Sequence, residues 1–120
     1  MKVEWDVFSG RPNPSWHLTA TQGQQFLNLL RQLRAAPVAS PRSEKLGYRG
    51  FMVSGIRDLE KVSEIFLQGP RVWIRSDEGE NQFHDETRGL ERFLLRTAED
   101  HLEPDLLATL SAWMENDEQR

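Results

Sequence analysis

The spacing of the apolar residues changes along the chain, and this change most limits the folds open to it. Near the N-terminus Val3, Trp5 and Val7 alternate with charged residues, which is the period of two expected of a half-buried strand. From Asp85 onward the period is 3.6, as in a helix. The residues that form the buried stripe of this predicted helix are Leu90, Phe93, Leu94, Thr97 and Ala98. Two periods in separate segments predict an α+β fold.

Two further helices are predicted from their start signals. Thr19 with Gln22, or Thr21 with Gln24, has the spacing of a capping box, and Pro37 stops the helix that follows. Its apolar stripe comprises Phe26, Leu29, Leu30 and Leu33. Pro104 suits the first position of a last helix. The buried stripe expected there comprises Leu106, Leu107, Leu110, Trp113 and Met114.

The middle of the chain has the composition of strands. Three are expected, at Tyr48–Val53, Val62–Leu67 and Arg71–Arg75, with a polar turn at Asp77–Glu80. Gly69-Pro70 is compatible with either a hairpin turn or a bulge within one strand. Together with an extended segment at Ser15–Leu18, the pattern predicts a small antiparallel or mixed sheet of three to five strands, with about three helices packed on one face.

The length of 120 residues fits a single α+β domain spanning residues 1–120. Residues 39–45 are the expected flexible connection, and residues 115–120 are an expected frayed tail. The chain has no cysteine, which excludes disulfides, thiolate metal sites and cysteine nucleophiles. No apolar stretch has the length of a membrane span, and we expect a cytoplasmic protein.

The charge distribution bears on the partners. The formal net charge is −4, without a basic run that would gather phosphates. We therefore expect no nucleic-acid partner and no membrane partner. The expected partner is an unidentified protein or small molecule, and the sequence is also compatible with a homo-oligomer.

The loop Gly10–Trp16 is the first candidate binding surface. Two prolines stiffen its backbone, which carries a guanidinium on Arg11, an amide on Asn13 and an indole on Trp16. The alternative is a structural loop in which Arg11 pairs with an acid, such as Asp85, Glu86 or Asp6, while Trp16 fills the core.

A second cluster of candidates lies at the expected start of the middle helix. His84, Asp85 and Glu86 are adjacent, and Arg88 follows within one helical turn. Three consecutive side chains make a poor metal-ligand set, so capping of the helix by Asp85 is favoured over catalysis or metal binding. Arg88 and Glu91 have the spacing of an ordinary surface pair. Tyr48 is a further ligand-binding candidate, although aromatic residues on strands more often belong to a core.

Three segments resemble small bacterial proteins without an assigned function. The most specific of them is the run from Asp6 to Trp16, DVFSGRPNPSW. The segment Leu46–Phe51 and the spacing of Asp85, Arg88 and Glu91 are similar to later segments of the same proteins. The resemblance covers most of the chain and implies no activity, cofactor or catalytic residue.

The favoured hypothesis is a non-catalytic binding or protein-interaction module, because no nucleophile–base set, phosphate loop or metal set is recognised. No catalytic residue, cofactor or metal ligand is assigned. The first alternative is a small enzyme or accessory subunit of a biosynthetic pathway with a polar pocket near Arg11 and His84. The second alternative is a substrate or scaffold protein of a biosynthetic cluster.

Overall fold

The computed structural model describes residues 1–6, 12–36, 50–57, 59 and 61–118. Its sheet has seven strands in the order β2-β1-β4-β5-β6-β7-β3, and every neighbouring pair is antiparallel. The α+β class is confirmed, but the expected number of three to five strands is too low. The strands are β1 (Lys2–Trp5), β2 (Ser15–His17), β3 (Arg34–Ala35), β4 (Phe51–Ser54), β5 (Val62–Gln68), β6 (Arg71–Ser76) and β7 (Gly79–His84).

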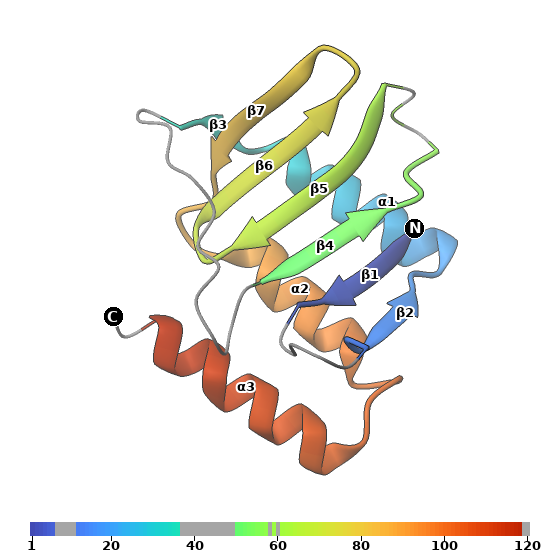
Figure 1. The fold of residues 1–120 in the computed structure, drawn as a ribbon, viewed down its shortest axis with the longest axis vertical. Coiled ribbons are helices and arrows are strands. Elements are labelled where there is room, and N and C mark those ends of the chain that lie inside the picture. The colour runs from blue at the N-terminus through green and yellow to red at the C-terminus, as the bar shows by residue number, and fades with distance from the viewer. Residues whose placement is uncertain (7–11, 37–49, 58, 60, 119–120) are drawn as a thin grey trace.

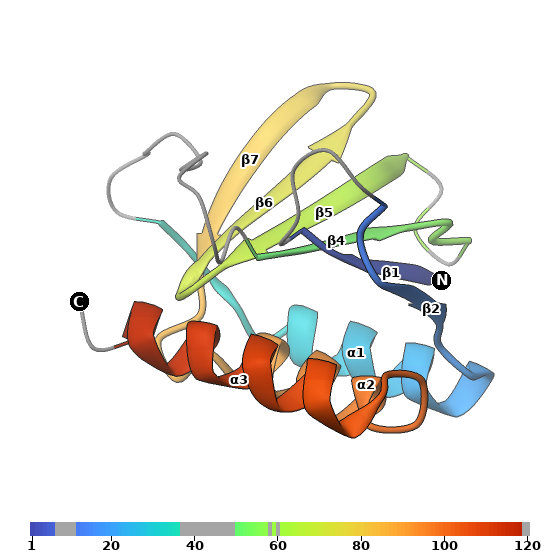
Figure 2. The same cartoon turned by 60° about the horizontal axis from the view of Figure 1, so that its bottom comes forward.

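The described helices are α1 (Ala20–Leu30), α2 (Gly89–Ala98) and α3 (Pro104–Glu118), and they lie on one face of the sheet (Figure 2). Helix α2 lies between α1 and α3, so one of its sides faces α1 and the other faces α3 (Figure 1). Among the described residues, no helix combines the length and the apolar character needed to cross a membrane.

The core fills the space between the sheet and the helices. Strand β1 contributes Val3 and Trp5, both fully buried, and the Trp5 ring stacks on Phe51 of β4 with a centroid distance of 4.9 Å. The helices contribute Phe26, Leu30, Phe93, Leu94, Leu110 and Met114. The core predicted from the two apolar periods is therefore confirmed for these residues, while Val7 lies outside the described part of the chain.

The segment Gly69-Pro70 is a hairpin turn. Gln68 and Arg71 are paired across it, and Gly69 has a φ of +60°, which an L side chain rarely adopts. A bulge does occur in the same hairpin, but between Val62 and Glu64. The polar turn expected at Asp77–Glu80 is shorter, because Gly79 already pairs with Ser76 and begins β7.

The helix starts follow the sequence in two cases out of three. The capping box of α1 is formed by Thr19 and Gln22, with reciprocal hydrogen bonds of 3.0 and 3.1 Å. Helix α3 begins at Pro104 as expected, and it continues to Glu118, beyond the point where fraying was expected. Helix α2 begins at Gly89 and not directly after Asp85.

The late start of α2 has a visible cause. Arg88 precedes the helix in the left-handed conformation, with a φ of 57°, and the chain therefore turns sharply before Gly89. The Asp85 carboxylate nevertheless accepts a hydrogen bond of 2.9 Å from the backbone N–H of Leu90. The prediction that Asp85 is the N-cap is therefore wrong: Arg88 holds that position, and Asp85 accepts from Leu90 from outside the helix.

Candidate functional site

The described part of the Gly10–Trp16 loop is occupied by contacts within the protein. Trp16 is 3% exposed, and its Nε1 donates a hydrogen bond of 2.9 Å to Oγ1 of Thr97. Nδ2 of Asn13 donates to the carboxylates of Glu4 and Asp6, at 3.2 and 3.3 Å. Arg11 and Tyr48 lie outside the described residues, so the expected pairing of Arg11 with Asp85, Glu86 or Asp6 stays a prediction. The loop as a binding surface therefore stays a prediction, while the core position of Trp16 supports the structural alternative.

Arg88 is a buried residue rather than one of a surface pair. Its Nε donates a hydrogen bond of 2.6 Å to Oε1 of Glu91, and the two side chains are 8% and 1% exposed. The guanidinium lies over the Gly69 turn, within 3.7 to 3.9 Å of the position that a Cβ of Gly69 would take. Arg88 joins α2 to the β5–β6 hairpin and is not displayed to a ligand.

His84 and Asp85 line a small pocket between the C-terminal end of α1, β3 and the start of α2. Arg34 and Glu86 also line it, and its open volume is about 360 Å³. Asn13 and Arg88 do not line it, so the structure does not gather the described candidates into one pocket. The described residues contain no group of three metal-ligating side chains.

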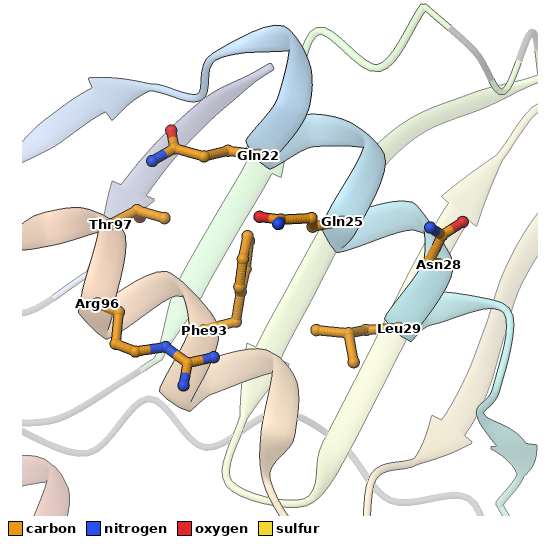
Figure 3. A pocket seen from close by; sticks show the side chains of 7 residues that line it. All are labelled: Gln22, Gln25, Asn28, Leu29, Phe93, Arg96 and Thr97. Carbon is orange, nitrogen blue, oxygen red and sulfur yellow. The ribbon is translucent and has the colours of Figure 1, made fainter.

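A larger groove runs between α1 and α2, and we refer to it as the amide groove. Its open volume is about 550 Å³, within the range of ligand sites in proteins. Gln22 and Gln25 extend from α1 toward α2, and the Phe93 ring stands between the two helices beside Arg96 (Figure 3). The lining residues are Gln22, Gln25, Asn28, Leu29, Phe93, Arg96 and Thr97.

The amide groove presents hydrogen-bond donors more than acceptors. Oε1 of Gln22 already accepts from the N–H of Thr19, and Oδ1 of Asn28 accepts from Arg31 at 3.4 Å. Each of these oxygens keeps a second lone pair, whereas the amide nitrogens of both residues donate no hydrogen bond within the described part of the chain. Among the described residues, no acid pairs with the exposed guanidinium of Arg96, which adds further donors and a positive charge.

The floor of the groove is apolar and fixed. Phe93 belongs to the core cluster and is 8% exposed, and Leu29 packs against that cluster. At one end, Oγ1 of Thr97 accepts from Trp16 and donates to the backbone oxygen of Leu94 at 2.7 Å. A rigid apolar floor below polar side chains is the usual composition of a binding site.

No signal in the sequence singles out the amide groove. Gln22, Gln25 and Asn28 recur every three residues on the polar side of α1, where they are indistinguishable from solvated side chains. Arg96 likewise lies outside the predicted apolar stripe of α2. Only the packing of α1 beside α2 makes these residues neighbours. No protein-family model, curated protein or solved structure matches the chain.

Proposed function

We propose that the protein is a non-catalytic binding module that holds a short acidic segment of a partner protein in the amide groove. The observation that carries the proposal is the set of donors from Gln22, Gln25, Asn28 and Arg96 above an apolar floor. No acidic side chain is among the residues that line the groove.

The chemistry of the groove matches a polypeptide that carries a carboxylate. Carboxamides form hydrogen bonds with peptide groups, because each offers the same donor and acceptor as the main chain. The guanidinium of Arg96 suits an aspartate or glutamate side chain, which it can bind with two parallel hydrogen bonds. The surface of Leu29 and Phe93 suits an adjacent apolar side chain.

A selection from phage-displayed random peptides tests the proposal. The wild-type protein is expected to enrich peptides in which an acidic residue stands next to an apolar one. Arg96→Gln is expected to weaken the binding of an enriched synthetic peptide about tenfold, the usual loss for one charge-assisted hydrogen bond. Gln25→Ala is expected to weaken it less, because a neutral hydrogen bond contributes less.

Matched controls separate binding from folding. Gln24→Ala is the control for Gln25→Ala, because Gln24 is the preceding residue of α1 and does not line the groove. Arg71→Gln is the control for Arg96→Gln, because it removes an exposed arginine from β6. Both should bind like the wild type. The proposal fails if the enriched peptides lack acidic residues, or if Arg96→Gln binds them as tightly as Arg71→Gln does.

A further inference from the structure

A second open pocket lies at the other side of α1, where β1 and α1 begin. Its open volume is about 670 Å³. Lys2 of β1, His17 of β2 and Arg57 after β4 line it, and no acidic side chain is among its lining residues. We refer to it as the cationic pocket. In a protein of net charge −4, such a concentration of basic side chains without acids calls for an explanation.

The register of the sheet places two of these residues next to each other. Lys2 and His17 are direct partners across the antiparallel β1–β2 pair, so their side chains leave the sheet on the same side. Basic groups directly opposite each other do not stabilise a sheet. In the described part of the chain neither residue forms an ion pair or a side-chain hydrogen bond. Their arrangement therefore is not accounted for by folding.

The acids of the sheet around Lys2 have partners outside the pocket. Glu4 follows two residues along β1 on the same face as Lys2, and its carboxylate accepts a hydrogen bond of 3.2 Å from Nδ2 of Asn13. Lys2 pairs with Ser54, and Ser54 pairs in turn with Glu64 of β5, whose carboxylate contacts Nη1 of Arg75 at 3.3 Å. Neither Glu4 nor Glu64 lines the pocket.

We infer that the cationic pocket binds the phosphate group of a soluble phosphorylated small molecule. The inference is independent of the amide groove, because none of Lys2, His17 and Arg57 lines that groove. The volume exceeds what a single phosphate fills and falls within the range of small-molecule sites. Pyrophosphate carries more negative charge than inorganic phosphate, so it should bind more tightly to a pocket lined by basic residues.

Isothermal titration calorimetry at low salt tests this inference on the whole chain. Pyrophosphate is expected to bind in a saturable manner with a Kd below about 1 mM, and inorganic phosphate more weakly. Lys2→Gln and Arg57→Gln should each weaken pyrophosphate binding about fivefold, since each removes one exposed charge from the site. Both positions are exposed, so the variants should melt like the wild type.

Two comparisons make the outcome specific. Arg71→Gln removes a charge at the opposite end of the sheet and should leave pyrophosphate binding unchanged. Malonate, a dicarboxylate of similar size, should bind more weakly than pyrophosphate. The inference is overturned if pyrophosphate does not saturate the protein, if malonate binds equally well, or if Lys2→Gln and Arg57→Gln bind pyrophosphate like Arg71→Gln.

Discussion

Gly50 is the position where the smallest change should have the largest effect on stability. It is buried immediately before β4 with a φ of +95°, and its carbonyl accepts a hydrogen bond of 2.9 Å from the N–H of Asp6. A Cβ added there would overlap the carbonyl oxygen of Leu67 and would lie 2.9 Å from its carbonyl carbon. These are backbone atoms of β5, so they cannot move without disturbing the β4–β5 pairing.

Gly79 provides the matched control for Gly50→Ala. Its φ is +122°, but nothing lies within 4 Å of the position of an added Cβ. Both alanine variants suffer backbone strain of about 1 to 2 kcal/mol, and both gain similarly from a less flexible unfolded chain. Only Gly50→Ala adds the steric overlap, which costs about 1 to 3 kcal/mol. We therefore expect a loss of about 2 to 5 kcal/mol for Gly50→Ala and about 1 to 2 kcal/mol for Gly79→Ala.

Urea denaturation followed by tryptophan fluorescence measures this difference. With a urea dependence of about 1.5 kcal/mol per molar, an additional loss of about 2 kcal/mol lowers the midpoint by about 1.3 M relative to Gly79→Ala. Far-UV circular dichroism confirms that each variant is folded at the start. Coincident midpoints for the two variants would refute the close approach of Gly50 to β5.

Three further predictions concern buried side chains, and all are measured by denaturation. Glu91→Gln leaves the Arg88 charge buried and should lower the free energy of unfolding by about 3 kcal/mol. Replacing both residues by apolar ones should recover most of this loss, and equal losses for the single and the double variant would contradict the buried pair. Trp16→Phe should lower the free energy of unfolding by about 1 kcal/mol more in the wild-type protein than in the Thr97→Val variant, because that variant already lacks the Trp16–Thr97 hydrogen bond. Phe93→Ala should cost about 3 to 5 kcal/mol, and a melting temperature lowered by only a few degrees would contradict its core position.

The elements that could be predicted are those with strong local signals. Thr19 and Gln22 mark the start of α1 because the capping box is formed entirely within four residues. Pro104 marks the start of α3 for the same local reason. Val3 and Trp5 identify β1 because one face of this strand is buried and the other is not.

The elements that were missed depend on distant pairing. Strand β7, Gly79–His84, has only Phe83 as an apolar residue, and β3 is two residues long. Both lie at one edge of the sheet, where little apolar surface is needed and no alternation develops. The buried position of Arg88 was equally hidden, because its i, i+3 spacing from Glu91 is the same for a surface pair.

The net charge of −4 bears on how strongly an anionic ligand can bind in the amide groove or in the cationic pocket. At physiological ionic strength, charges beyond about 8 Å are largely screened, so an anionic ligand is neither strongly repelled by the distant acids nor attracted from afar. Binding then depends on the groups within reach, which are Arg96 in the amide groove and Lys2, His17 and Arg57 in the cationic pocket. An acidic protein can therefore bind anions, provided that its basic side chains are kept free of internal acids. Two contacts serve this condition near the cationic pocket: the Glu4 carboxylate accepts a hydrogen bond from Asn13, and the Glu64 carboxylate pairs with Arg75.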